Sequence, residues 1–279
     1  MRGTTVRDIW KAGGNAVSGW LQTPDILAAE TIASLGFDAV CVDLQHGTID
    51  MQAAVGLFQA ISTSNATPLA RPTACEPAQI MKLLDAGAFG IICPMVNTGE
   101  ESERLVAACH YAPRGNRSFG PVRAAVYAGS EYMAKANDTI FSLAMIETRQ
   151  ALDNIDDIVS VKGLTGLYLG LSDLSISLGY PPAQDSSHGE ILGGREGAVL
   201  AGPRIEAVDE AQLDVDPPQD PLARVPYGAL AEDALRIDHA LHIGHRQAST
   251  GWKGRRLNRV PRLEPGGRHW SATPSAARP

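Results

Sequence analysis

Six short apolar segments, separated by stretches of helical periodicity, restrict the fold of this chain more than any other feature. They cover residues 16–21, 38–44, 68–70, 89–96, 140–146 and 164–169. Strands that recur about every 25 to 30 residues with helices between them are typical of βα units. Their nearly continuous apolar character indicates that both faces of the sheet are covered, as parallel sheets require. The sequence therefore predicts an α/β fold built on a parallel sheet.

The stretches between these strands carry helix start and stop signals. Thr23 is the expected N-cap of the first of these helices, with Pro24 at its first helical position and Gly36 as its stop. Gly87 is expected to end a later helix, and Thr98 is expected to cap the one after it. The helices predicted from this periodicity cover residues 24–35, 49–62, 77–85, 99–110 and 151–159.

A closed barrel is favoured over an open sheet for this strand order. No G-x-G-x-x-G motif follows the first strand, which removes the main support for a dinucleotide-binding fold. Polar residues instead follow successive strands, and a closed barrel brings the carboxyl ends of all its strands to one rim. We therefore expect a TIM-type (β/α)8 barrel, with these polar residues at the rim: Gln22, Asp43, His46, Arg71, Glu147 and Asp173.

The composition favours a small-molecule partner. The chain of 279 residues has 24 Lys and Arg against 31 Asp and Glu, and no basic run in its first two thirds suggests a nucleic-acid surface. No apolar run has the length of a signal peptide or a membrane span, so we expect a soluble, cytoplasmic protein with no membrane partner. The four cysteines show no C-x-x-C spacing, which argues against a zinc site or a disulfide framework.

The chain changes character near Pro182. All five Phe, all six Met and all four Cys precede Glu147, whereas the last 97 residues hold nine of the 18 prolines. We find no seventh or eighth strand there, only a weak helix over 229–243, and we interpret the histidines at 239, 242 and 245 as part of a polar tail. We therefore predict a barrel domain over 1–182, incomplete after its sixth strand, and an atypical tail over 183–279. One hypothesis is that a frameshift or a fused reading frame produced this tail.

Several rim residues are suited to chemistry. In V-D-L-Q-H-G, at 42–47, Asp43 precedes His46 by three residues, and a carboxylate can fix the tautomer of an imidazole and raise its basicity. His46 could instead only cap the following turn. Glu147 and Asp173 form a natural ligand pair for a hard divalent cation, although Asp173 could simply cap a helix over 174–178. Arg71 could grip a carboxylate or an enolate, or could form a surface salt bridge.

Eight segments of the chain together resemble one enzyme family. They span about residues 20–182 in the family's order and spacing, and they resemble the HpcH/HpaI family of metal-dependent class II 2-keto-3-deoxy-acid aldolases. The segments are G-F-D-A-V-C-V-D-L-Q-H-G at 36–47, R-P at 71–72, L-L-D-A-G-A at 83–88, P-M-V-N-T at 94–98, Y-A-P-R-G-N-R-S at 111–118, M-I-E-T at 145–148, A-L-D-N-I-D-D-I at 151–158 and G-L-Y-L-G-L-S-D-L-S-I-S-L-G-Y-P at 166–181.

The resemblance implies a barrel of the pyruvate/phosphoenolpyruvate superfamily that binds Mg, Mn or Co. In that family the matching positions hold the metal (Glu147 and Asp173), stabilise the pyruvate enolate (Arg71), act as catalytic base (His46) and orient that base (Asp43 and Asp85). Ser172 and Asp173 match positions that contact the substrate, and backbone N–H groups after Ser172 are suited to its carboxylate. The family often has Gln where this chain has Met145.

The function that this resemblance implies is retro-aldol cleavage of a 4-hydroxy-2-oxo acid, of the 2-keto-3-deoxy acid type, to pyruvate and an aldehyde. The partners are then a small 2-oxo acid and an aldehyde. The family forms homo-oligomers, trimers or hexamers, through a last helix that is not recognisable after Pro182. Two alternatives stay open: a citrate-lyase-like or malyl-CoA-lyase-like lyase, for which no basic CoA patch is recognisable, and a catalytically inactive truncated barrel.

Overall fold

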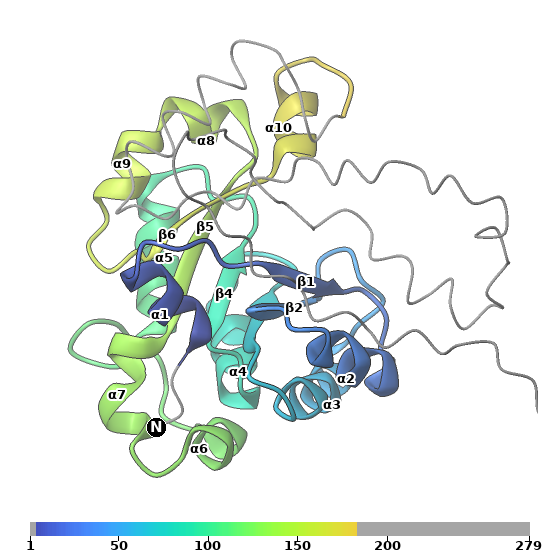
Figure 1. Cartoon of the computed structure of the whole chain (residues 1–279). Helices are drawn as coiled ribbons and strands as arrows, with labels where there is room; N and C mark the ends of the chain where they lie inside the picture. The colour runs from blue at the N-terminus through green and yellow to red at the C-terminus, as the bar shows by residue number, and fades with distance from the viewer. Residues whose placement is uncertain (1–3, 183–279) are drawn as a thin grey trace, which may run out of the picture. The chain divides into compact units, whose positions relative to one another are not determined.

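Six parallel strands form one curled sheet in the computed structural model, which describes residues 4–182 (Figure 1). The strands lie side by side in the order of the sequence, from β1 to β6. This arrangement confirms the predicted α/β fold and its parallel sheet, and its shape is that of a half-barrel. The strands are β1 (Ser18–Leu21), β2 (Ala39–Asp43), β3 (Thr67–Arg71), β4 (Gly90–Cys93), β5 (Phe141–Ile146) and β6 (Gly166–Leu169).

The largest difference from the predicted strands is at β4, which is shorter than residues 89–96. Pro94 follows it directly, and Met95 has a φ of 55°, in the left-handed region that a strand does not use. The apolar run therefore continues beyond the strand into a turn. Three predictions lie outside the described residues. They are the closure of the barrel, the helix over 229–243 and the domain boundary after residue 182.

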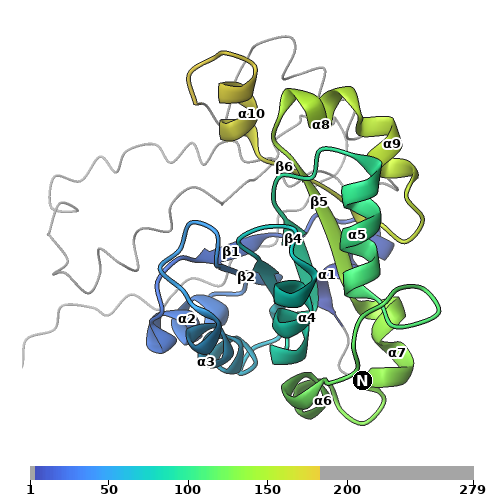
Figure 2. The same ribbon diagram turned by 180° about the vertical axis from the view of Figure 1, so that it is seen from behind.

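The helices lie mainly on the convex side of the sheet (Figures 1 and 2). No helix in the part of the chain that the structure describes is both long and apolar enough to cross a membrane. Three of the helices, α1, α6 and α7, were not predicted from the sequence, because they are short and show no extended helical repeat of apolar residues. The helices are α1 (Thr5–Lys11), α2 (Ile26–Ser34), α3 (Met51–Ile61), α4 (Pro77–Ala86), α5 (Gly99–Cys109), α6 (Val122–Ala128), α7 (Tyr132–Thr139), α8 (Arg149–Asp153), α9 (Ile155–Ser160) and α10 (Leu171–Ser177).

Several helix ends follow the predicted signals and others correct them. Thr98 caps α5 by accepting a hydrogen bond from the Glu101 N–H, and Gly87 ends α4 with a φ of 115°. The N-cap of α2 is Asp25 rather than Thr23, because its carboxylate accepts the N–H of Ala28 at 3.0 Å. The predicted helix over 151–159 is two helices, α8 and α9, which meet at Asn154.

The sheet separates two apolar clusters. Side chains on its convex face pack with the helices, whereas the inner, concave face carries Ala39, Cys41, Leu69, Ile92, Phe141, Leu143, Met145 and Tyr168. Alternation along each strand explains this division, since neighbouring residues point to opposite faces. Helix α1 adds Val6 to the inner cluster, and the ring of Trp10 lies 5.2 Å from that of Phe141. Helix α1 therefore covers the amino-terminal end of the inner face.

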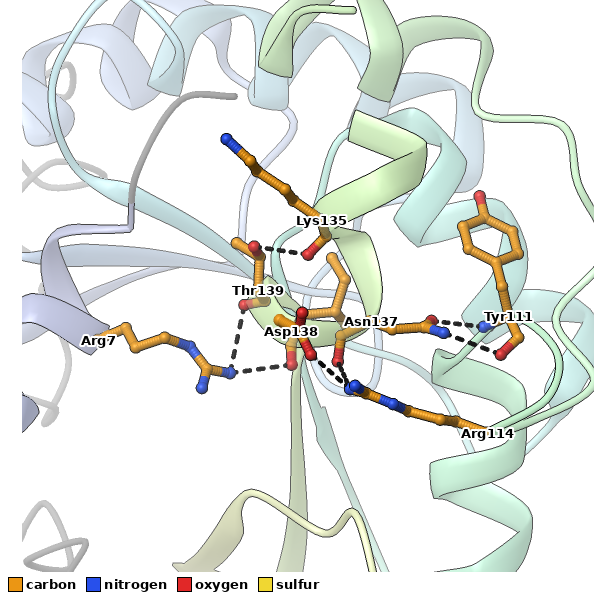
Figure 3. A network of polar contacts seen from close by, with 8 residues as sticks. Arg7, Tyr111, Arg114, Lys135, Asn137, Asp138 and Thr139 are labelled. Carbon is orange, nitrogen blue, oxygen red and sulfur yellow. Dashed lines mark hydrogen bonds and ion pairs between the residues drawn. The ribbon is translucent and has the colours of Figure 1, made fainter. Parts of the chain in front are cut away.

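A polar network ties helix α1 and the loop after α5 to the end of α7 (Figure 3). The Arg7 guanidinium donates to the carbonyl oxygens of Thr139 and Ile140, at 3.4 and 3.2 Å. The Asn137 side chain accepts the N–H of Tyr111 at 2.7 Å and donates to its carbonyl oxygen at 3.0 Å. Because α7 leads directly into β5, this network lies at the amino-terminal edge of the sheet, opposite the predicted rim.

Candidate active site

The inner rows of the strands change from apolar to polar at the carboxyl edge of the sheet. Asp43 continues the row of Ala39 and Cys41, and the sheet register places Asp43 beside Arg71 on the neighbouring strand. Glu147 follows Met145 by two residues and therefore continues the inner row of β5. The predicted gathering of Asp43, Arg71 and Glu147 at one edge is thus present in this half-barrel.

Asp43 and Arg71 form a buried, two-pronged ion pair. Arg71 Nε donates to Asp43 Oδ1 at 2.8 Å and Nη2 donates to Oδ2 at 2.6 Å. The Asp43 side chain is fully buried and the residue Arg71 is 8% exposed. Such a fork fixes both the position and the plane of the guanidinium. The surface salt bridge considered for Arg71 is therefore the wrong description of this contact.

Electrostatics keep the Asp43 carboxylate ionised. Burial alone would raise its pKa, but the hydrogen bonds and charge of Arg71 outweigh burial and hold that pKa below its usual value. The backbone N–H groups of Gln45 and His46 add hydrogen bonds to Oδ1, at 3.0 and 3.3 Å. On its other side, the guanidinium carbon of Arg71 lies 4.7 Å from the centre of the Trp20 ring. Arg71 is therefore held from two directions.

His46 lies where the sequence predicts, just past the end of β2, but its contact with Asp43 differs from the prediction. Asp43 bonds the backbone N–H of His46, and within residues 4–182 nothing forms a hydrogen bond with the imidazole ring. The carboxylate is instead occupied by Arg71. The His46 side chain is exposed at the rim. The chain turns at Gly47, where the backbone lies so close to Asp43 that a Cβ on residue 47 would overlap the backbone oxygen of Asp43.

Asp85 does not lie at this rim in its own chain. Helix α4 begins after the carboxyl end of β3 and ends before the amino end of β4, so Asp85, near its last residue, lies at the opposite edge of the sheet. There its Oδ1 accepts a hydrogen bond from Arg117 Nη2 at 2.8 Å. Burial raises the pKa of Asp85, against the effect of Arg117. The expected contact between Asp85 and His46 is therefore absent from this chain as described.

Glu147 is a buried carboxylate with one oxygen engaged. Its Oε1 accepts the backbone N–H of Met95 at 2.6 Å, and the residue is only 2% exposed. No described residue donates a hydrogen bond to Oε2. Burial raises the pKa of Glu147 to about 7; the negative charge of Asp173 also raises it, while the Met95 N–H and Arg71 oppose the shift. Burial, reinforced by the charge of Asp173, therefore disfavours the ionised form of Glu147.

Asp173 and Ser172 lie in the first turn of α10, and Asp173 is exposed at the rim. Asp173 is not the cap of this helix, as one alternative had it, because the N-cap is Gly170. A Cβ at Gly170 would lie 2.7 Å from Glu147 Oε2. The absence of a side chain at Gly170 therefore lets the backbone pass close to the unengaged carboxylate oxygen.

The carboxylates at this edge fit a divalent cation. Glu147 and Asp173 would be its protein ligands, and within residues 4–182 no group of three or more His, Cys, Asp or Glu side chains could hold a metal ion. Two carboxylates, with water and substrate oxygens in the remaining positions, are typical of Mg²⁺ sites. Glu147 Oε2, to which no described residue donates a hydrogen bond, and the exposed carboxylate of Asp173 both agree with this ligand set.

Sequence reasoning missed four residues of this site: Trp20, Met95, Asn97 and Gly170. Trp20 could have been found from its position on the inner row of the first strand, next to the polar Gln22. The roles of Met95 and Gly170 depend on backbone geometry, which residue type alone does not reveal. Asn97 forms hydrogen bonds with Thr148, after β5, and with Asn154, between α8 and α9, and only the folded structure brings these residues together.

Comparisons with known proteins agree with this geometry. A family model described as HpcH/HpaI aldolase/citrate lyase matches residues 19–228, which corrects our expectation that the resemblance ends near Pro182. The hydroxypyruvate/pyruvate aldolase of Rhizorhabdus wittichii is 48% identical over 204 residues, which cover 72% of this chain and 81% of that protein. The 4-hydroxy-2-oxo-heptane-1,7-dioate aldolase of Salmonella dublin is 34% identical over 197 residues, covering 70% of this chain and 74% of that protein.

A solved structure shows the same fold. The crystal structure of an HpcH/HpaI aldolase/citrate lyase family protein from Burkholderia cenocepacia J2315 matches with a TM-score of 0.63 and 26% identity. The match covers 69% of this chain and 77% of that chain. Family model, relatives and fold agree, and the chain belongs to the HpcH/HpaI aldolase/citrate lyase family.

Proposed function

We propose that this protein is a divalent-metal-dependent aldolase that reversibly cleaves a 4-hydroxy-2-oxo acid to pyruvate and an aldehyde. One observation carries the proposal: an arginine locked in plane by a buried aspartate lies at the same edge of the sheet as a buried carboxylate with a free oxygen. Members of this family generally depend on a divalent metal ion. The aldolase names of the relatives support the same reaction.

Glu147 and Asp173 would hold the cation, which we propose to be Mg, Mn or Co. When bound there, the cation supplies Lewis acidity to the 2-oxo acid and offsets the negative charge of the two carboxylates. Ser172, in the same turn as Asp173, is suited to contact the carboxylate of the substrate. The choice of ligands follows the oxygen preference of hard cations.

Arg71 would stabilise the enolate. As the C3–C4 bond of the substrate breaks, its electron pair passes into the 2-oxo group and negative charge grows on that oxygen. Asp43 occupies Nε and Nη2 of Arg71, and no described residue accepts a hydrogen bond from Nη1, which can donate to the substrate oxygen. We assign Asp43 to positioning Arg71, since its ionised carboxylate is fully engaged.

His46 would act as the base. Its exposed imidazole at the rim can take the proton from the 4-hydroxyl group as C4 becomes the aldehyde carbonyl, and it can return that proton in the reverse direction. Because no described residue hydrogen-bonds the ring, its orientation in the reaction would come from substrate or water. We assign Asp85 no role in the site of its own chain.

The donor acid that we propose is pyruvate or hydroxypyruvate, following the printed names of the relatives. A citrate-lyase-like or malyl-CoA-lyase-like activity is not favoured, because both curated relatives described above are aldolases. An inactive barrel is not favoured either, because Asp43, Arg71, Glu147 and their partners are in place. Assembly as a homo-oligomer, as in the family, is also a proposal.

The test is pyruvate release from 4-hydroxy-2-oxoheptanedioate with Mg²⁺ or Mn²⁺, followed by coupled reduction of pyruvate. We expect EDTA to remove the activity and added cation to restore it. Arg71→Ala should lose the activity, whereas Arg114→Ala should keep it, since the contacts of Arg114, an exposed ion pair with Asp138 and a hydrogen bond to the Asn137 carbonyl oxygen, lie at the far edge of the sheet. Undiminished cleavage in the EDTA-treated protein would refute the metal assignment, and full activity of Arg71→Ala would refute the role of Arg71.

A further inference from the structure

We infer that Asn97 is a positioning residue: it holds the backbone of Met95 in the conformation that presents its N–H group to the Glu147 carboxylate. The inference rests on the proposed function, because it concerns the orientation of a proposed metal ligand. Neither the motif resemblance nor the ligand set assigns a role to this asparagine.

Met95 has an unusual backbone. Its φ of 55° makes it the one non-glycine residue with a left-handed φ among residues 4–182. Such a conformation is sterically unfavourable for a residue with a side chain, and it persists only when surrounding contacts impose it. Here it aims the Met95 N–H at Glu147 Oε1, 2.6 Å away. The strained turn therefore supplies the hydrogen bond that orients the carboxylate.

Asn97 makes the contacts that impose this turn. Its side-chain Nδ2 donates to the carbonyl oxygen of Met95 at 2.9 Å. This hydrogen bond closes the turn that runs from Met95 to Asn97. Its own backbone is fixed from both sides, since its N–H donates to Glu101 Oε2 at 2.6 Å and its carbonyl oxygen accepts from Asn154 Nδ2 at 2.8 Å. Asn97 therefore connects the turn to helix α5 and to the junction of α8 and α9.

A further contact links Asn97 to the chain that carries Glu147. The Thr148 hydroxyl donates to Asn97 Oδ1, and Thr148 directly follows Glu147 in the sequence. Asn97 thus joins the loop after β4 to the loop after β5 on either side of the carboxylate. Without its side chain, Met95 loses the bond that closes its turn and can relax toward negative φ. The N–H then turns away, and Glu147 Oε1 loses its donor.

The expected consequence is weaker cation binding. Removing a hydrogen-bonding partner that orients a metal ligand typically costs about 10- to 100-fold in metal affinity. We therefore expect Asn97→Ala to bind Mn²⁺ about 10- to 100-fold more weakly than the wild type. The affinity is measured by counting free Mn²⁺ by electron paramagnetic resonance in a titration of the full chain, with no substrate present.

A matched control separates this role from a general structural one. Asn137 also bridges a backbone N–H and a backbone carbonyl, those of Tyr111, but it does so at the far edge of the sheet (Figure 3). Asn137→Ala should therefore bind Mn²⁺ as the wild type does, even where it lowers stability. If Asn97→Ala does not fold, as judged by circular dichroism, Asn97→Ser takes its place with the same expected loss.

Rescue at Met95 tests the backbone step directly. Glycine adopts positive φ without steric cost, so Met95→Gly in the Asn97→Ala background should recover part of the lost affinity. Wild-type affinity in Asn97→Ala, or no recovery in the double variant, would overturn the inference while leaving the proposed function intact. Failure of the wild type to bind Mn²⁺ and to exchange the methyl protons of pyruvate would overturn both.

Discussion

Glu147 should destabilise the cation-free protein as the pH rises. Burial raises its folded-state pKa to about 7 from an ordinary value of 4.5. A carboxyl group with a raised folded-state pKa binds more protons in the native than in the unfolded state between these two values, so stability is lost with rising pH across this window. A shift of about 2.5 units corresponds to roughly 3 kcal/mol, of which about 2.5 kcal/mol falls between about pH 5 and pH 8.

The assay is urea unfolding in EDTA at about pH 5 and pH 8, for the wild type and Glu147→Gln. Because other groups titrate in both proteins, the informative quantity is the difference between the two pH dependences. We expect the wild type to lose about 2.5 kcal/mol more unfolding free energy than Glu147→Gln. Adding Mn²⁺ at the higher pH should then stabilise the wild type by about 2.7 kcal/mol at a concentration of about 100 times its Kd.

Two results would refute this reasoning. Equal pH dependences in the wild type and Glu147→Gln would mean that the buried carboxyl is not the group that titrates. Equal stabilisation of both proteins by Mn²⁺ would mean that the cation binds somewhere other than Glu147.

Three further substitutions probe the same edge of the sheet. Gly170→Ala places a Cβ 2.7 Å from Glu147 Oε2, so Mn²⁺ affinity should fall about 10-fold or more while circular dichroism stays unchanged; wild-type affinity would contradict this. Asp43→Ala leaves Arg71 buried without its partner, and urea unfolding should show a loss of about 3 to 5 kcal/mol; a loss below about 1 kcal/mol would argue against the ion pair. His46→Ala should lower kcat for cleavage about 100- to 10,000-fold with Mn²⁺ affinity unchanged, and undiminished turnover would exclude it as the base.

The fold, and the edge of the sheet at which Asp43, Arg71 and Glu147 gather, could be predicted because both depend on local patterns. Continuous apolar runs identify buried parallel strands, and polar residues placed directly after them mark the carboxyl edge. Asp43, Arg71 and Glu147 each follow such a run, and the structure gathers them at one edge. His46 also lies at that edge, although its ring does not contact Asp43.

The contacts within the site depend on geometry that sequence separation does not reveal. Asp43 pairs with Arg71, 28 residues away, because the register of β2 and β3 places them side by side. The direction of helix α4 places Asp85 at the opposite edge from His46 of the same chain, which its motif position alone does not reveal. The left-handed turn at Met95 could not be predicted because methionine is not a residue that normally signals positive φ.

The exchange of pyruvate methyl protons with deuterium tests the proposed enolate chemistry most directly, since it needs no knowledge of the aldehyde. In D₂O with Mg²⁺, proton NMR should show the methyl signal of pyruvate decaying in the presence of the wild-type protein. The signal should persist with Arg71→Ala or with EDTA, because enolate formation then lacks the guanidinium or the cation. Exchange at the wild-type rate in either case would contradict the proposal that Arg71 and a bound cation together stabilise a pyruvate enolate.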